Sequence, residues 1–316
     1  MLKIRDLFDG LPVPVPAGGP PHFSAHSVPG CEAHRIGKDP DGAPCLLLHV
    51  ASATGGAPQP PIILNHVAVQ HDVSCRISRP ESPLEEAVFT LIPCPTGDPL
   101  LRAIFLDVME VVVRAVGAAP SADRVRRAIE ELVELFRSLA RPPRKSARGV
   151  WAELFLMTRA RDVPRLAAAW HAAPGEAFDF SEGATRIEVK AASGGTREHY
   201  FSLTQVHPPH GVSVLIASLF AETLVGGMRI TGLLEALRIR LARCPELVLR
   251  IESVTAQSLG KSFALGLEES FDLERAEESL RFSEPHVIPA VPKNLPREVT
   301  DVRFRSDLSG CVDLAV

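Results

Sequence analysis

The sequence has few features that would suit a membrane or an extracellular protein. Its longest apolar run, at residues 212–220, is far shorter than the roughly 20 residues that a membrane-spanning helix needs. No basic segment followed by an apolar stretch opens the chain, so no signal peptide is visible. The six cysteines are scattered without a close pair, which argues against a zinc site or a redox motif. We therefore expect a cytoplasmic protein with free thiols.

The chain also has no excess of positive charge, because it contains 34 lysines and arginines but 38 aspartates and glutamates, which gives a net charge of −4. This balance argues against a broad nucleic-acid-binding surface, since phosphate contacts come from lysine and arginine, but it leaves a local basic patch open. Hydrophobic residues make up 46% and charged residues 23% of the 316 positions. We therefore expect an ordinary globular core, in one large domain or two smaller ones.

The N-terminal third of the chain is predicted to be a β-rich accessory domain. Residues 1–60 are rich in proline and glycine, which favours loops and short strands over helix. The apolar segment 99–116 predicts a helix. Three short apolar runs predict strands, at residues 45–50, 62–67 and 73–77. We find no catalytic motif in this part of the sequence.

A hairpin is predicted near the middle of the chain. The segment RIEVK alternates strictly between charged and apolar side chains, which is the pattern of a half-buried strand. Because the side chains of a strand alternate between its faces, Glu188 and Lys190 of this segment are predicted to share one face. The apolar run FDF and the turn-like residues 181–184 precede this strand, so the two runs are predicted to pair. The hairpin would bring Asp179 beside Glu188.

Two carboxylates and an ammonium that converge in this way suit divalent-metal chemistry. Mg²⁺ prefers oxygen ligands and usually keeps several waters, so two carboxylates would hold the ion and leave positions open for a phosphate oxygen and a water. Such an ion lowers the pKa of the water and polarises the phosphorus, and the Lys190 ammonium could orient the water or offset negative charge on the phosphate. A solvated hairpin face that carries these charges is the alternative, and the triplet alone does not decide between the two.

Two helices are predicted ahead of the hairpin, the first after an N-cap at Ser121 and the second at about residues 149–160. Glu153 is out of place in the second helix, because its neighbours three and four positions away are apolar or small. A buried carboxylate needs a partner, so we expect Glu153 either to form a salt bridge or to join the two hairpin carboxylates around a metal. The basic, proline-containing segment 141–148 between the helices is either a solvated linker or a phosphate-contacting segment beside the site.

This order of a helix glutamate, an aspartate and a Glu-x-Lys strand resembles the PD-(D/E)XK nuclease superfamily, in which these parts build the active site. A closer resemblance is to the PD-(D/E)XK motif proteins of prokaryotic restriction and phage-defence loci. The match covers most of the chain loosely and residues 149–222 well. Phe178 stands where the superfamily often has its eponymous proline. The matching segments are GVWAEL at residues 149–154, FDF at 178–180, IEVK at 187–190 and SLTQV at 202–206.

The resemblance implies metal ligation by Asp179 and Glu188, with support from Glu153. It also implies a catalytic role for Lys190 and a phosphate- or water-positioning role for Gln205. The implied cofactor is Mg²⁺ or Mn²⁺, and the implied reaction is in-line hydrolysis of a DNA phosphodiester by an activated water. Cleavage of both strands by a subunit with one site would favour a homodimer, and other proteins of a defence system are further expected partners.

The remaining sequence is compatible with a restriction-endonuclease-like α/β core, in which helices flank a mixed sheet in the order helix-β-β-β-helix-β. Four features support this order: a buried central strand at residues 212–220, a break at Gly226 and Gly227, a helix at 230–241, and a last core strand at 247–251. We thus expect a β-rich domain at residues 1–118, a nuclease-like core at 119–260, and a β-rich C-terminal extension at 261–316 that packs on the core.

Two functions are compatible with these residues and their order. The first is a Mg²⁺-dependent deoxyribonuclease, the nuclease arm of a restriction or phage-defence system, with endonuclease and exonuclease action both open. The second is a catalytically silent subunit of the same fold that binds DNA or scaffolds a defence complex. A structural protein with a chance motif is a third interpretation, and whether the carboxylates of Glu153, Asp179 and Glu188 converge separates it from the first two.

Overall fold

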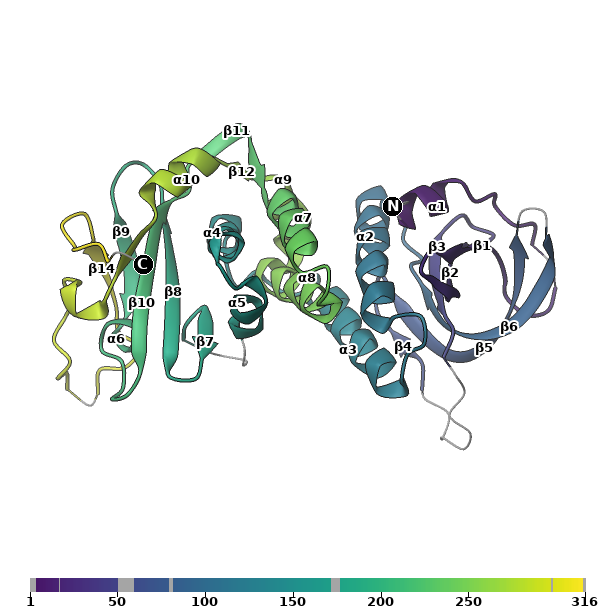
Figure 1. Ribbon diagram of the computed structural model, residues 1–316, viewed down its shortest axis with the longest axis horizontal. Helices are drawn as coiled ribbons and strands as arrows, with labels where there is room; N and C mark the ends of the chain where they lie inside the picture. Colours follow the sequence, from purple (N-terminus) through teal and green to yellow (C-terminus); the bar gives the residue numbers. More distant parts are fainter. Residues whose placement is uncertain are drawn as a thin grey trace. The chain divides into compact units, whose positions relative to one another are not determined.

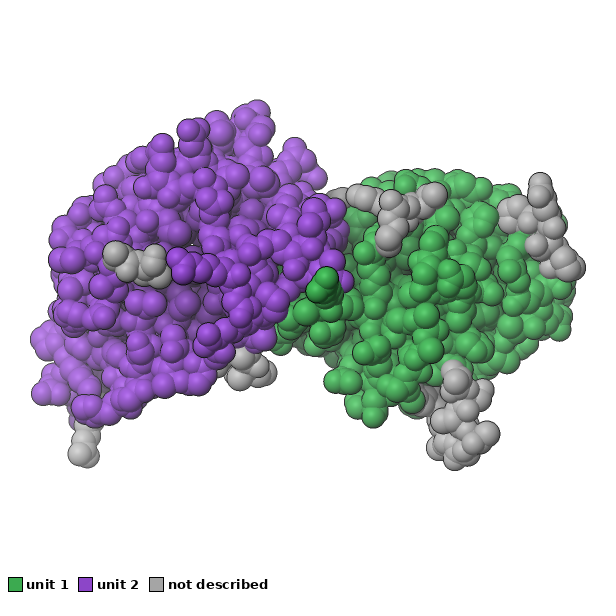
Figure 2. Space-filling model, viewed as in Figure 1, with its two compact units in different colours: residues 1–141, 243–257 green, residues 142–242, 258–316 purple. Residues whose placement is uncertain are grey.

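The structure is a computed structural model that describes residues 4–16, 18–50, 60–79, 82–171, 177–296 and 298–314 (Figure 1). The chain divides into two units, which Figure 2 shows in different colours. Residues 1–141 and 243–257 form unit 1, and residues 142–242 and 258–316 form unit 2. The helix after Ser121 thus falls in unit 1 and the C-terminal segment falls in unit 2, while the expected boundaries after residues 118 and 260 stay a prediction. Among the described helices, none is long and apolar enough to cross a membrane.

Unit 1 contains a closed five-stranded barrel. The strands follow the order β1-β2-β3-β6-β5, and β5 closes the ring by pairing in parallel with β1. Their bounds are β1 His22–Val28, β2 Cys31–Lys38, β3 Pro44–Leu48, β5 Ala68–Arg79 and β6 Ser82–Pro93, and the short β4 Ile62–Ile63 pairs with β5. The barrel core consists of Phe23, Ala25, Cys45, Leu47, Cys75, Ile77, Phe89 and Leu91. The predicted β-rich character is confirmed, whereas barrel closure was not anticipated.

The helices of unit 1 include two that the sequence predicted. These are α2 Pro99–Val116 and α3 Ala122–Ser138, which accompany the short α1 Ile4–Asp9. Ser121 caps α3 as predicted, because its hydroxyl oxygen accepts the N–H of Arg124 at 3.3 Å.

The expectation of a core strand at residues 247–251 is wrong, because they lie within helix α8 Pro245–Leu259. A short apolar run cannot by itself distinguish a strand from a buried helix segment. Pro245 is the first residue of this helix, a position where the missing N–H of proline costs nothing. The proline therefore marks the start of α8 as much as the end of the preceding helix.

Unit 2 is built on a mixed four-stranded sheet in the order β13-β10-β8-β7. The strands are β7 Phe180–Glu182, β8 Thr185–Ala192, β10 Ser213–Phe220 and β13 Arg281–Ser283. β8 and β10 run parallel at the centre, and the edge strands β7 and β13 are antiparallel to their neighbours. The central position of β10 is as predicted, but the strand that completes the sheet is β13 from the C-terminal segment.

Helices and a second small sheet cover the strands of unit 2. Helix α4 Ala147–Arg159 packs against β8 and against α7 Ile230–Arg240. Strand β9 Glu198–Ser202 pairs with β14 Arg303–Asp307. An apolar cluster combines residues of β9, α6, β10, the C-terminal segment and the stretch just before β7: Phe178, Phe201, Val206, Val214, Ile216, Ile288 and Leu308. Shorter helices are α5 Val163–Ala169, α6 Leu203–Val206, α9 Phe263–Glu268 and α10 Leu273–Ser279.

The break expected at Gly226 and Gly227 is an irregularity inside a strand. Strand β11 Thr223–Arg229 runs through both glycines and pairs with β12 Ser270–Phe271, but its register shifts between Thr223 and Met228. Gly226 adopts a φ of 79°, in the left-handed region that favours glycine. The two glycines therefore interrupt the pairing without ending the strand.

Candidate active site

The predicted hairpin forms, and it places Asp179 beside the Glu-x-Lys strand. β7 and β8 pair antiparallel with Phe180 opposite Ile187, and the chain reverses at Gly183, whose φ is 54°. Asp179 immediately precedes β7, and its Oδ2 accepts the backbone N–H of Val189 at 2.7 Å. This hydrogen bond fixes the Asp179 carboxylate against β8 at the level of the motif.

Glu188 and Lys190 point to the same side of β8, as the alternation predicted. Lys190 Nζ donates to Glu188 Oε1 at 2.7 Å and to Gln205 Oε1 at 3.1 Å. The side chain of Glu188 is only 8% exposed, so this face of the strand is not the solvated one that the alternative interpretation required. Within the described ranges, the second oxygen of this carboxylate, Oε2, is buried and has no hydrogen-bond partner.

Gln205 holds the Lys190 ammonium from the opposite side. It lies on α6, and its Oε1 also accepts the N–H of Ser202 at 3.1 Å. Its Nε2 donates to the carbonyl oxygen of Ala177 at 3.2 Å, close to the start of the hairpin. Gln205 thus connects β9 to the residues that precede Asp179, and its oxygen orients the lysine.

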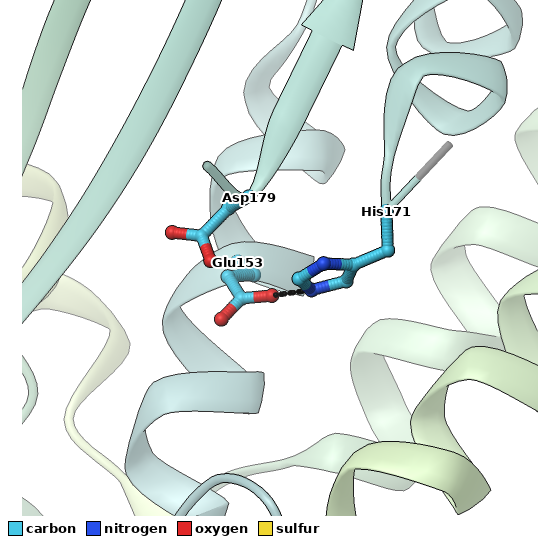
Figure 3. Close-up of side chains that lie close together, drawn as sticks. All are labelled: Glu153, His171 and Asp179. Atoms are coloured by element: carbon cyan, nitrogen blue, oxygen red, sulfur yellow. Dashed lines mark hydrogen bonds and ion pairs between the residues drawn. The ribbon is translucent and has the colours of Figure 1, made fainter. Parts of the chain in front are cut away.

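Glu153 reaches the same site from α4, where it is 2% exposed. Its Oε2 accepts Trp170 Nε1–H at 2.8 Å and lies 3.1 Å from His171 Nε2, as the dashed line in Figure 3 shows. Its Oε1 accepts from Lys145 Nζ at 2.6 Å. Every oxygen of this buried carboxylate is therefore hydrogen-bonded, which is the condition for placing it inside an apolar helix face.

Lys145 connects the helix glutamate to the hairpin, and sequence reasoning did not identify it as a site residue. Its ammonium bonds Glu153 Oε1 and Asp179 Oδ1 and lies 3.2 Å from His171 Nε2. Lys145 belongs to the basic segment 141–148, for which contact with phosphate beside the site was one of two alternatives. The segment does reach the site, but the partners of its lysine within the protein are carboxylates.

His171 is the second residue that sequence reasoning missed. Its φ of 43° lies in the left-handed region, which is uncommon for a residue other than glycine. The backbone is held there because the His171 N–H donates to the carbonyl oxygen of Asp179 at 2.9 Å. No local pattern indicates this conformation, since it depends on pairing between Trp170 and Phe180 across the segment that separates them.

Burial and neighbouring charges shift the pKa values of the ionisable groups in the site in different directions. Burial, reinforced by the charge of Asp179, raises the pKa of Glu188 to about 8. Burial and then the charge of Glu153 also raise the pKa of Asp179. Burial acts on Glu153 too, but Lys145 and His171 outweigh it and lower the pKa of that carboxyl. Burial likewise opposes the charge on Lys145, and its two carboxylate partners outweigh this and raise its pKa. Lys145 therefore remains charged, while Glu188 readily retains a proton.

The residues present suit a divalent cation. Among the described residues, Glu153, His171 and Asp179 form a group in which one ligand atom from each lies within 4.8 Å of the others (Figure 3). Glu188 is not in that group, but its buried Oε2 lacks a hydrogen-bond partner in the described chain, and a bound cation would satisfy this oxygen. Carboxylate oxygens suit Mg²⁺ and Mn²⁺, and an imidazole nitrogen favours the transition metal.

Comparison with known proteins gives one match. None of the curated proteins and none of the solved structures matches the chain. A family model, described as putative PD-(D/E)XK family member (DUF4420), matches residues 5–309. Because this match spans nearly the whole sequence, the chain belongs to the family of putative PD-(D/E)XK members known as DUF4420.

Proposed function

We propose that the protein is a metal-dependent nuclease that hydrolyses phosphodiester bonds of DNA. Asp179 and Glu188, supported by Glu153, would hold Mg²⁺ or Mn²⁺, and Lys190 would act on the phosphate. The observation that carries the proposal is the buried Glu188 Oε2 without a hydrogen-bond partner in the described chain, next to Asp179 and to a lysine ammonium. PD-(D/E)XK proteins are generally nucleases, which agrees with this assignment.

The side chains of the site have distinct parts in this proposal. A bound divalent ion supplies Lewis-acid polarisation of the phosphate and lowers the pKa of water. Lys190 carries a positive charge beside Glu188, where it can offset negative charge that develops on the phosphate oxygens. Gln205 keeps that ammonium in place through its Oε1. Trp170 donates to Glu153 and, together with Lys145, fixes the orientation of this carboxylate.

The arrangement of unit 2 is the scaffold that we assign to this activity. We propose that α4 and the sheet β13-β10-β8-β7 form the restriction-endonuclease-like core. DNA is the proposed substrate, and a homodimer is the proposed form for cleavage of both strands. Action within a restriction or phage-defence system, together with other proteins of that system, is an expectation that the motif resemblance alone supports.

A catalytically silent, DNA-binding or scaffolding subunit is the second candidate function. One observation favours it: the Lys145 ammonium is already ion-paired with both Glu153 and Asp179, as expected of a permanent ion pair in a silent site. A subunit of this kind would bind neither Mn²⁺ nor Mg²⁺ and would cleave no DNA.

The decisive experiment is cleavage of supercoiled plasmid and linear duplex DNA with Mg²⁺ or Mn²⁺. We expect wild-type protein to cleave, and Asp179→Asn and Lys190→Met to lose activity by about 100-fold or more. Glu182→Gln, on the exposed side of the same hairpin, and Lys261→Met, on the surface, are the matched controls and should retain activity.

The outcomes separate the two candidates. Undiminished cleavage by folded Asp179→Asn would refute the assignment of the site. A wild-type protein that binds Mn²⁺ in calorimetry but cleaves nothing would require a missing partner. A wild-type protein that neither binds Mn²⁺ nor cleaves would establish the silent subunit.

A further inference from the structure

A lysine outside the nuclease motif holds the buried acidic residues of the site together. Lys145 Nζ lies 2.6 Å from Glu153 Oε1, bonds Asp179 Oδ1, and lies 3.2 Å from His171 Nε2. Lys145 donates to the two carboxylate oxygens, which can only accept, whereas His171 Nε2 accepts from it only in the tautomer that leaves this nitrogen without a proton. The side chains of Glu153 and Asp179 are 2% and 7% exposed, so each needs a compensating charge. Lys145 provides one positive charge that the two carboxylates share.

The three partners of Lys145 are also the group suited to a metal ion. Glu153, His171 and Asp179 each offer one ligand atom, and these atoms all lie within 4.8 Å of one another. Divalent ions bind carboxylate oxygens and imidazole nitrogens at roughly 2.0–2.2 Å. An ion that shared these atoms would therefore lie in the space that the ammonium fills. An ammonium and a divalent ion in the same space would repel each other strongly, so they would not occupy it together.

We propose that Lys145 and a divalent cation are alternative occupants of the space between Glu153, Asp179 and His171, so that Lys145 sets the affinity of the site for metal ion. This inference rests on the proposed function, because it takes the acidic group to be a metal site. It adds a residue that the nuclease motif does not contain. It also adds a requirement: the ion enters by exchanging with an ammonium that the site already holds.

The surroundings of Lys145 allow its side chain to leave while its backbone stays fixed. The N–H groups of Arg144 and Lys145 both donate to the carbonyl oxygen of Ser258, at 2.9 and 3.0 Å. Ser146, the next residue, caps α4 by accepting the N–H of Gly149 at 3.2 Å. The chain on either side of the side chain is thus tied down, and only the four-carbon stem of Lys145 must turn.

A cavity beside Lys145 offers the displaced ammonium a place. The cavity has a volume of about 380 Å³, and Lys145 itself contributes to its wall. Glu269 and Arg148 line the same cavity, so it offers the ammonium a polar, partly open environment. Exchange therefore moves the lysine from two buried carboxylates toward a partly open cavity with its own acidic residue, instead of leaving a buried charge without a partner.

Mn²⁺ binding by calorimetry tests the proposal on the whole chain without reference to activity. Lys145→Met removes the ammonium and keeps a stem of similar length. Arg144→Met is the matched control, because it removes one positive charge from the adjacent, exposed position. We expect Lys145→Met to bind Mn²⁺ at least about tenfold more tightly than wild type, because the ion no longer competes with a resident cation. Arg144→Met should change the affinity by no more than about threefold.

A second measurement uses wild-type protein, so it holds even where Lys145→Met fails to fold. Lysine acetylation is followed by peptide mass with and without saturating Mn²⁺, and exposed Lys261 serves as the internal reference. We expect Mn²⁺ to increase the rate at Lys145 by about fivefold or more relative to Lys261, because an ammonium in three contacts is poorly available to the reagent.

The results distinguish this inference from the proposed function. Mn²⁺ binding that Lys145→Met leaves unchanged or weakens would overturn the exchange and leave the metal site standing. Unchanged or slower acetylation of Lys145 in Mn²⁺ would overturn it in the same way. No Mn²⁺ binding by folded wild type and variants would overturn both the exchange and the metal-dependent nuclease.

Discussion

The buried carboxyl of Glu188 should make the stability of unit 2 fall with rising pH when metal is withheld. Burial and the charge of Asp179 raise the pKa of Glu188 from its ordinary value of 4.5 to about 8. The unfolded chain releases this proton near pH 4.5, whereas the folded chain retains it to about pH 8. The stabilising contribution of the neutral carboxyl is therefore complete below pH 4.5 and is lost across that interval.

The size of the effect follows from the width of the interval. At about 1.4 kcal/mol for each pH unit, the span from 4.5 to about 8 corresponds to about 5 kcal/mol of unfolding free energy. Glu188→Gln removes the titration. The free energy of unfolding of this variant, minus that of wild type, should therefore rise by about 3–4 kcal/mol between pH 5 and pH 8, because part of the titration lies outside these two pH values. The new amide adds an offset of about 1–3 kcal/mol that does not vary with pH, so the slope is the test.

Tryptophan fluorescence in urea is a suitable assay, with a chelator present throughout. The two tryptophans of the chain, Trp151 and Trp170, are both fully buried in unit 2, so their signal follows unfolding of that unit. Glu182→Gln, an exposed carboxylate of the same hairpin, is the control and should show no such slope. A constant difference between Glu188→Gln and wild type from pH 5 to pH 8 would refute the role of burial. In a separate titration without the chelator, Mn²⁺ should stabilise wild type more at pH 8 than at pH 5, because the ion must displace a proton.

Three further predictions concern the scaffold around the site. Burial, and next the charges of Lys190 and Arg197, lower the pKa of His199 to about 4, so wild type should lose stability as the pH falls from 6.5 to 4. Acid unfolding followed by circular dichroism should show a smaller loss in His199→Asn, which lacks the titrating imidazole. Arg197 donates three hydrogen bonds to buried oxygen atoms, so Arg197→Met should lower the unfolding free energy by about 3 kcal/mol; a urea titration that shows less than about 1 kcal/mol would contradict this. A Cβ on Gly227 would collide with the carbonyl oxygen of Phe271, so Gly227→Ala should lower the free energy of unfolding, measured by thermal unfolding, by about 1–3 kcal/mol. A Cβ on Gly310 would have no atom within 4 Å, so Gly310→Ala is the control and should change this free energy little.

Local pattern was sufficient for the elements whose residues interact with near neighbours in the chain. The helix at 99–116 and the Ser121 cap follow from apolar spacing and from a hydroxyl next to the first turn. The hairpin of β7 and β8 follows from strict alternation around a short turn. Its register brings Asp179 to Val189 without any distant contact. The motif residues could therefore be named from the sequence, although their chemical roles remain proposals.

The same local reasoning failed where two structures share one pattern. The apolar run at 247–251 suits a buried strand and a buried helix equally, and packing around Pro245–Leu259 selects the helix. Barrel closure depends on the pairing of Phe23 with Ile77, which no feature of either strand indicates. These outcomes depend on contacts between residues far apart in the chain.

The sequence by itself determined that Asp179, Glu188 and Lys190 share one hairpin, because a strand and its turn are set by residues within a few positions of one another. Only the tertiary structure decided that Lys145 lies between Glu153 and Asp179, and that His171 joins them. It also decided that the Glu188 face is buried, which changes the charge that this carboxyl carries near neutral pH. The physical reason is that desolvation and ion pairing depend on what surrounds a side chain in space, and those surroundings come from a helix, a loop and a hairpin that fold against each other.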